Sequence, residues 1–169
     1  MTAEASDSLQ LKGGNNGRLT RSILLVEDNP VDVDLTLRAF ARRRLGNPIQ
    51  VARDGEEALT WLPRWEAGEP LPVVILLDLK LPRVDGLEVL RQLKAHSICR
   101  SVPVVVLTTS GEDRDVQTAY QLGANSYIIK PVDMSDLLMK LSRAAEAYEL
   151  KHAQDVAQRE KVIRIESNL

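Results

Sequence analysis

Five short apolar runs restrict the fold of this chain more strongly than any other feature of its sequence. They cover residues 23–26, 49–52, 73–77, 104–107 and 127–129. A strand that is covered on both faces is apolar along its length, whereas a half-exposed strand alternates between apolar and polar residues. Each run is followed by a stretch with helical spacing. This order predicts an α/β fold with a doubly wound, five-stranded parallel sheet of the (βα)5 type.

The stretches between the runs predict five helices, which we number in chain order. Asn29 followed by Pro30 predicts the start of the first helix, because asparagine caps a helix and proline fits its first turn. A capping box over 109–112 predicts the start of the fourth helix. Gly46 and Gly123 predict where the first and fourth helices end. The apolar positions of the five helices are Val31, Leu35, Leu37 and Phe40; Ala58, Leu59 and Leu62; Val84, Leu87, Leu90 and Leu93; Val116, Ala119, Tyr120 and Leu122; and Leu137, Leu138, Leu141 and Ala145.

Two tryptophans, Trp61 and Trp65, lie four residues apart near the end of the second predicted helix. Pro63 stands between them, and a proline breaks the register of a helix interior. We therefore expect the two rings to pack under the extended loop that 63–72 predicts, rather than to share one helical face.

The composition is that of a globular protein with one domain. The chain has 169 residues, of which 44% are hydrophobic and 27% charged, and its net charge is −2. This balance excludes the broad basic face of a dedicated nucleic-acid-binding protein. A single cysteine excludes an internal disulfide and a cysteine-based zinc site. No apolar run approaches the roughly 18 residues of a membrane span, and no signal peptide is visible, so we expect a cytoplasmic protein without a membrane partner.

The two ends of the chain differ from its middle. Residues 1–20 are polar and glycine-rich, and we predict a disordered N-terminal tail because such a segment buries too little apolar surface. Residues 21–150 form the predicted domain. Residues 151–169 form a C-terminal extension that carries apolar side chains such as Val162 and Ile165. We expect this extension to continue the last helix, to fold onto its own domain, or to act as a dimer arm.

Polar side chains follow four of the five apolar runs. Glu27 and Asp28 follow the first run, Asp78 the third, Thr108 the fourth and Lys130 the fifth. In an open parallel sheet the carboxyl ends of the strands form the functional crevice. Three carboxylates beside one lysine favour a hard divalent cation, and ligands that are all oxygen favour Mg²⁺ over zinc. Because Mg²⁺ commonly shares its ligands with a phosphate, the pattern indicates phosphoryl chemistry.

Four segments around these residues resemble the receiver domain of two-component response regulators. They are SILLVEDNP, LLDLKLPRVDG, VVVLTTS and NSYIIKP, in that order, and the resemblance covers roughly residues 21–148. It implies a flavodoxin-like, CheY-like fold and a single-domain response regulator of a phosphorelay. Such a protein has no enzymatic activity beyond Mg²⁺-dependent self-phosphorylation and autodephosphorylation.

The resemblance also implies roles for individual residues. Asp78 is the expected phosphoacceptor, which takes its phosphoryl group from a phosphohistidine of a sensor histidine kinase. Glu27, Asp28, Asp78 and the backbone carbonyl of Leu79 are the expected Mg²⁺ ligands. Lys130 is expected to pair with the phosphoryl oxygens.

Four further expectations come from the same family pattern. Thr108 is expected to hydrogen-bond the phosphoryl group and move towards it, and the ring of Tyr127 to turn inward on activation. The Lys130–Pro131 peptide bond is expected to be cis. Lys80 and Thr109 hold the two positions that tune the lifetime of the phosphoryl group. Our hypothesis is that the Lys80 side chain overhangs the acyl phosphate and impedes the attacking water.

Within the family, the sequence is similar to those of the small regulators that partner phytochrome-type photoreceptor kinases. These commonly form homodimers through the fourth and fifth helices, the fifth strand and the C-terminal extension. The chain departs from the cyanobacterial form at Lys80, where asparagine is usual, and at Ala147 and Tyr148, where Phe-Trp is common.

Other functions remain as alternatives. One is a phosphorelay shuttle or a motor-binding regulator for an unrelated kinase. An aspartate-nucleophile phosphatase would need an acid two residues after Asp78, where Lys80 stands. A nucleotide-binding enzyme would need a glycine-rich loop after the first strand, and a DNA-binding regulator would need a further domain.

Overall fold

A computed structural model describes residues 21–109 and 111–148 of the chain. The predicted tail 1–20 and extension 151–169 lie outside these residues. All five predicted strands are present and parallel, in the order β2-β1-β3-β4-β5. They are β1 (Ile23–Val26), β2 (Ile49–Ala52), β3 (Val74–Leu77), β4 (Val104–Thr108) and β5 (Ser126–Ile129). The doubly wound α/β fold is therefore confirmed.

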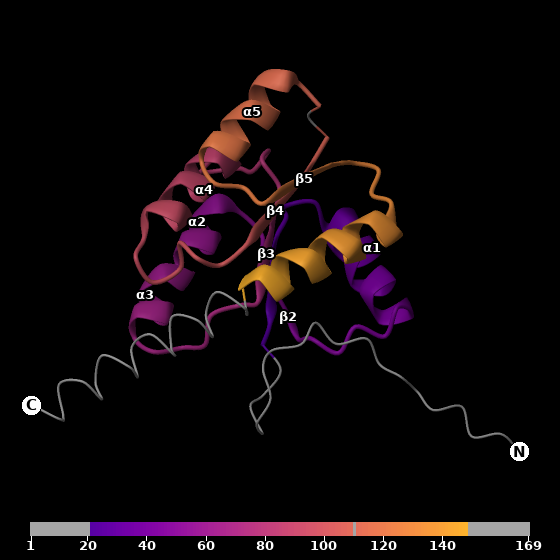
Figure 1. Ribbon diagram of the computed structural model, residues 1–169, viewed down its shortest axis with the longest axis horizontal. Helices are drawn as coiled ribbons and strands as arrows, with labels where there is room; N and C mark the ends of the chain where they lie inside the picture. Colours follow the sequence, from indigo (N-terminus) through magenta and orange to yellow (C-terminus); the bar gives the residue numbers. More distant parts are fainter. Residues whose placement is uncertain (1–20, 110, 149–169) are drawn as a thin grey trace, which may run out of the picture.

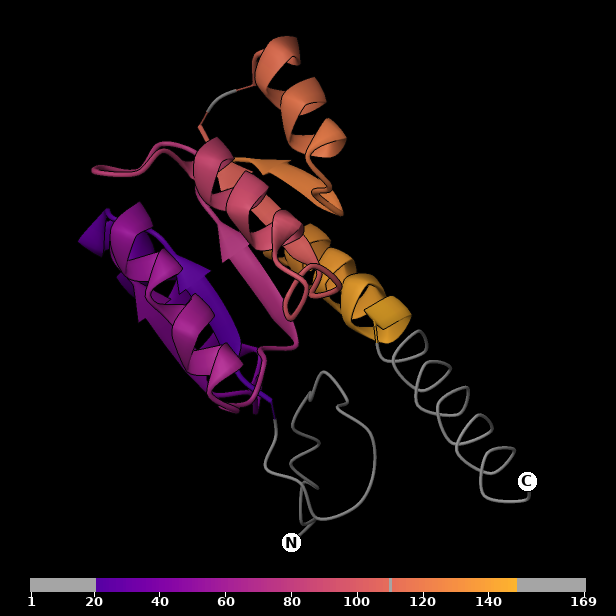
Figure 2. The same cartoon turned by 90° about the vertical axis from the view of Figure 1, so that its left-hand side faces the viewer.

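Helices cover both faces of the sheet (Figures 1 and 2). They are α1 (Pro30–Arg42), α2 (Gly55–Leu59), α3 (Trp61–Glu66), α4 (Gly86–Ala95) and α5 (Asp113–Gln121), followed by a helix that is described over 134–148 and that we call the C-terminal helix. Residues of α1 and the C-terminal helix pack in one hydrophobic cluster, and residues of α2 to α5 pack in another.

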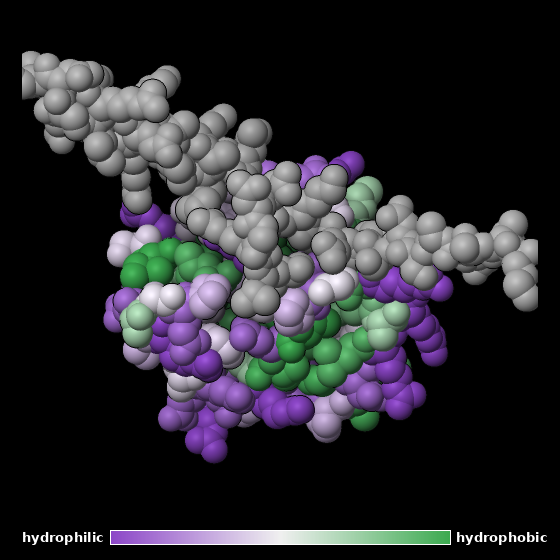
Figure 3. Space-filling model, turned by 90° about the horizontal axis from the view of Figure 1, so that it is seen from below, coloured by the Kyte–Doolittle hydropathy of each residue, from purple (hydrophilic) through white to green (hydrophobic). Residues whose placement is uncertain are grey.

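The strands contribute side chains to both hydrophobic clusters, because successive side chains along a strand point to opposite faces of the sheet. In β1, Leu24 and Val26 join the cluster under α2 to α5, whereas Ile23 and Leu25 join the cluster under α1. All four side chains are buried. This two-sided burial explains why the strand is apolar along its whole length. Figure 3 views the molecule from below, where apolar surface of the described residues lies among polar side chains.

The helix boundaries differ from the sequence prediction in several places. The second predicted helix is two helices, α2 and α3, so the fourth and fifth predicted helices are α5 and the C-terminal helix. The predicted end of the first helix at Gly46 is wrong, because α1 ends at Arg42 and Arg44 takes the left-handed conformation with φ 54°. The capping box is also wrong, since α5 begins at Asp113 after Glu112, which makes no side-chain cap.

Other local predictions are confirmed. The side chain of Asn29 accepts hydrogen bonds from the backbone N–H groups of Val31 and Asp32, and so caps α1. Gly123 ends α5 with φ 103°, a conformation that favours glycine. Among the described residues, none of the helices has the length and apolar character that crossing a membrane requires.

The two tryptophans correct a further expectation. Trp61 and Trp65 lie together in α3, with ring centroids 6.1 Å apart, and both are buried. Pro63 is tolerated because it stands in the first turn of α3, where the missing N–H has no helical partner. The rings therefore do share one helical face.

Candidate functional site

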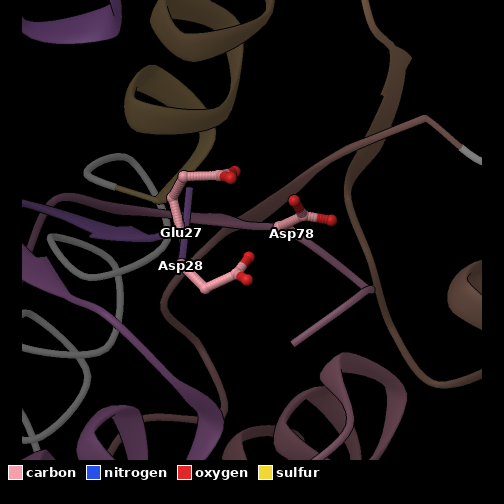
Figure 4. Close-up of side chains that lie close together, drawn as sticks. All are labelled: Glu27, Asp28 and Asp78. Atoms are coloured by element: carbon pink, nitrogen blue, oxygen red, sulfur yellow. The ribbon is translucent and has the colours of Figure 1, made fainter. Parts of the chain in front are cut away.

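The carboxyl ends of β1 and β3 bring three carboxylates together (Figure 4). Glu27 and Asp28 follow β1 directly, and Asp78 follows β3. The two strands are neighbours, with Val26 opposite Leu77, so the residues that follow them lie side by side. One oxygen each of Glu27, Asp28 and Asp78 can be chosen so that all three lie within 4.8 Å of one another. We call these three residues the acidic group.

The members of the acidic group differ in burial. Glu27 is 2% exposed and Asp78 is 7% exposed, whereas Asp28 is exposed. The pKa of Glu27 is raised from 4.5 to about 7, chiefly because the side chain is buried; the neighbouring Asp78 also raises it, while Lys130 opposes both. A buried carboxylate of this kind gains from any cation that reaches it. Asp28 is thus the most solvent-exposed member of the acidic group.

Lys130 extends from the end of β5 into the acidic group. Its Nζ lies 2.7 Å from Oε2 of Glu27 and 3.1 Å from Oδ2 of Asp78. Burial lowers the pKa of Lys130, but the hydrogen bonds that its ammonium donates to the surrounding carboxylates, together with their negative charge, outweigh burial and hold the pKa above its usual value. The backbone N–H of Lys130 donates to the carbonyl of Thr108 at 2.8 Å, which ties the loop after β5 to the end of β4.

The two oxygens of Asp78 have different partners. Oδ2 accepts from the ammonium of Lys130, and Oδ1 accepts from the backbone N–H of Lys80 at 3.0 Å. The Lys80 residue itself is exposed. The carboxylate is therefore oriented from two sides by groups that follow β3 and β5.

The residues expected to switch lie on β4 and β5, the strands that lead to Thr108 and Lys130 at this edge of the sheet. Thr108 is the last residue of β4 and is fully buried. Tyr127 is 8% exposed and packs in the cluster under α2 to α5, so its ring is buried in this structure. Thr109 is exposed. The Lys130–Pro131 peptide bond is cis.

The carbonyl of Leu79, an expected metal ligand, is oriented by a backbone contact. This carbonyl accepts a hydrogen bond from the backbone N–H of Gly86 at 2.9 Å. It therefore points to the first residue of α4. A Cβ atom on Gly86 would meet the Leu79 carbonyl oxygen at 2.7 Å and the Asp78 carbonyl oxygen at 2.4 Å, so only glycine allows this close approach.

One residue of the site escaped the sequence analysis. Asp32, in the first turn of α1, places its Oδ2 atom 3.0 Å from Nζ of Lys130. An acidic residue in a first helical turn is ordinarily explained by its favourable interaction with the helix dipole. That explanation gave no reason to expect Asp32 to contact Lys130. The available signal was its spacing of four residues from Asp28, which places both side chains near the start of α1.

The arrangement fits a hard divalent cation. The acidic group offers oxygen ligands only, and the carboxylates around Lys130 outnumber its single positive charge. Oxygen ligands at the carboxyl edge of a parallel sheet suit Mg²⁺, which keeps several waters and accepts phosphate oxygens. A carboxylate, a cation site and an ammonium are the parts that phosphoryl transfer needs.

Known proteins resemble the chain in both sequence and structure. The family model described as "Response regulator receiver domain" matches residues 23–142. The probable methanogenesis regulatory protein FilR2 of Methanothrix harundinacea is 50% identical over 116 residues, which cover 68% of this chain and 75% of FilR2. Response regulator Rcp1 of Synechocystis is 37% identical over 131 residues, 76% of this chain and 88% of Rcp1.

Solved structures agree with these matches. The structure of the bacteriophytochrome response regulator AtBRR superimposes with a TM-score of 0.65 at 45% identity, over 73% of this chain and 91% of AtBRR. A crystal structure of the Mn²⁺-bound form of Rcp1 superimposes with a TM-score of 0.62 at 36% identity, over 72% of this chain and 89% of Rcp1.

Proposed function

The chain belongs to the response regulator receiver domain family, and on this premise we propose that it accepts a phosphoryl group on Asp78 from a sensor histidine kinase. The observation that carries the proposal is the geometry around Asp78. One of its oxygens is held by the Lys130 ammonium at 3.1 Å, within a group of carboxylates able to hold a cation.

The reaction is a phosphoryl transfer between two side chains. An oxygen of the Asp78 carboxylate attacks the phosphorus of a phosphohistidine, and a P–O bond forms as the P–N bond breaks. The imidazole leaves with the electron pair of the broken bond. The product is an acyl phosphate, a covalent intermediate whose charge is spread over the phosphoryl oxygens. Lys130 lies in position to pair with that charge.

Glu27, Asp28 and Asp78 are the residues that would hold Mg²⁺. A bound Mg²⁺ supplies positive charge to the phosphoryl oxygens. The protein's own part is to hold three carboxylates within 4.8 Å of one another and to orient Asp78 through the Lys80 N–H and Lys130. We keep the three carboxylates as the protein ligands and omit the Leu79 carbonyl, which is directed at Gly86.

Thr108 and Tyr127 are the proposed route from the site to the surface. Thr108 ends β4 next to the site, and Tyr127 stands opposite Val106 of the same strand in the register of β4 and β5. A movement of Thr108 towards a phosphoryl group therefore reaches the strand that carries Tyr127. The phosphorylated protein then signals through a protein partner. We propose no catalysis beyond its own phosphorylation and dephosphorylation.

A phytochrome-type kinase is the proposed donor. The support is the likeness to AtBRR, a bacteriophytochrome response regulator, at 45% identity. The likeness to FilR2 at 50% identity shows that closely similar sequences also serve other regulators. The alternative is a phosphorelay shuttle or a motor-type regulator for a kinase unrelated to phytochromes, and transfer assays with purified kinases of both types separate these outcomes.

We also propose a homodimer through α5, β5, the C-terminal helix and the extension that follows it. Two large apolar side chains support this face: Tyr120 of α5 and Ile129 at the end of β5 are each 49% exposed. β5 is an edge strand of the sheet. Light scattering tests the proposal: Tyr120→Glu should shift the mass towards the monomer, whereas Val31→Glu on α1, also exposed, should not. Equal masses for both variants and the parent, or a monomeric parent with and without phosphodonor, would refute it.

Incubation with Mg²⁺ and acetyl phosphate, followed by intact mass measurement, tests the phosphoacceptor. The parent chain should gain one phosphoryl group, and Asp78→Asn should gain none. Asp34→Asn, on the exposed face of α1, is the matched control and should behave as the parent. Absence of a mass gain on the parent, or the same gain on Asp78→Asn, would overturn the proposal.

A further inference from the structure

We propose that Asp32 is a positioning residue that competes with the phosphoryl group for Lys130 and so weakens the phosphorylated state. The inference rests on the proposed function, since it assumes that Asp78 carries the phosphoryl group. It concerns a residue that is neither the phosphoacceptor nor part of the acidic group.

The first step is the count of donors on Lys130. Its Nζ lies 2.7 Å from Glu27, 3.0 Å from Asp32 and 3.1 Å from Asp78, in each case from a carboxylate oxygen. A lysine ammonium has three N–H donors. Each donor therefore has one carboxylate in the described part of the chain, and none is left for a further acceptor.

The second step is the distinct position of Asp32. Glu27 and Asp78 follow strands and have side chains that are 3% and 9% exposed, whereas Asp32 belongs to α1 and its side chain is 34% exposed. Asp32 is not among the residues that could share a cation. Its carboxylate is also not needed to cap α1, because the Asn29 side chain does that. The Asp32 side chain instead forms an ion pair with Lys130.

The third step is the exchange that phosphorylation requires. When a phosphoryl group forms on Asp78, its oxygens need a donor, and Lys130 is the ammonium already within hydrogen-bond distance of that carboxylate. The carboxylate of Asp32 competes for the same ammonium and holds it towards α1. It also places a negative charge near the phosphoryl oxygens, and the two negative charges repel each other.

Removal of this charge should strengthen the binding of a phosphoryl-like anion. One unit charge about 6 Å away, at an effective dielectric constant of about 40, changes the affinity about tenfold. The direction of the change matters most, because a variant that merely damaged the site would bind the anion more weakly. A gain of affinity separates positioning from a structural role.

The experiment measures fluoroberyllate binding at saturating Mg²⁺ by ¹⁹F NMR and calorimetry. Fluoroberyllate forms a tetrahedral adduct on an aspartate carboxylate and imitates the phosphoryl group without hydrolysing. Asp32→Asn removes the charge, and Asp32→Ala removes both charge and acceptor. Asp34→Asn is the matched control, because Asp34 lies on the same helix and pairs with Arg38 at 2.9 Å instead of with Lys130.

Both Asp32 variants should bind fluoroberyllate about tenfold more tightly than the parent, by the charge argument above, and Asp34→Asn should match the parent. Equal or weaker binding by both Asp32 variants, relative to Asp34→Asn, overturns the inference and leaves the proposed function standing. If the parent binds no fluoroberyllate and gains no phosphoryl mass, the proposed function fails and this inference fails with it.

Discussion

Without a divalent cation, the protein should lose stability as the pH rises from about 4.5 to about 7. Glu27 is buried, and its burial and the neighbouring Asp78 raise its pKa from 4.5 to about 7. Between these values the folded chain holds a proton that the unfolded chain has released. Folding is then linked to proton uptake, so the free energy of unfolding falls as the pH increases.

The size of this loss follows from the two pKa values. The difference between 4.5 and about 7 corresponds to about 3 kcal/mol of unfolding free energy, at about 1.4 kcal/mol for each pH unit. The stabilising contribution is fully present below pH 4.5 and is lost above pH 7. A cation in the acidic group offsets the excess charge, so saturating Mg²⁺ should flatten the dependence.

Urea unfolding followed by circular dichroism, in the presence of a chelator, measures the effect. Glu27→Gln imitates the protonated side chain at every pH, so it should resemble the parent near pH 4.5 and exceed its stability by about 3 kcal/mol near pH 8. Glu146→Gln, on the exposed side of the C-terminal helix, serves as the control. If the difference between Glu27→Gln and the parent is the same at both pH values, the reasoning about the buried carboxylate is wrong.

Three further predictions concern the loops and the core. A Cβ atom at Gly55 would lie 1.9 Å from the carbonyl oxygen of Val84, so Gly55→Ala should lower the free energy of unfolding in urea by about 2 kcal/mol. In the control Gly111→Ala, the new Cβ meets only the end of a flexible side chain and should lower it less; equal losses of unfolding free energy would contradict the clash. Lys80→Ala should shorten the half-life of the phosphoryl group about threefold, or about 0.7 kcal/mol in the barrier to hydrolysis, measured by the decay of the phosphorylated mass; an unchanged or longer half-life would remove its proposed shielding role. Burial raises the pKa of Cys99 to about 11, so near pH 8 only about one thiol in a thousand is ionised, and reaction with a disulfide reagent should need unfolding; rapid reaction of the folded protein would disprove this.

The fold could be predicted from the sequence because a strand that is buried on both faces is an unbroken run of apolar residues. The boundaries of β1 and β2 match the predicted runs 23–26 and 49–52. Helix ends are recorded less directly. α1 ends before Arg44, which adopts a positive φ although a glycine stands two residues later. The position of the helix end was therefore set by tertiary packing and not by the local preference of glycine for a positive φ.

The site could be predicted only where its residues follow strands. Glu27, Asp28, Asp78 and Lys130 were found because the carboxyl ends of parallel strands share one edge. Asp32 was missed because its role depends on how α1 sits relative to the end of β5, and Lys130 is 98 residues further along the chain. Only the folded structure brings such partners together.

The distance along the chain between Lys130 and its partners also has a consequence for folding order. Lys130 follows the edge strand β5 and meets Glu27 across 103 residues and Asp78 across 52. During synthesis the acidic residues emerge well before this lysine, and closing such long loops costs entropy that must be met before the contacts form. The acidic group therefore acquires its ammonium only when β5 docks, and a nascent chain without β5 has neither the charge balance of this site nor the ammonium that would pair with a phosphoryl group there.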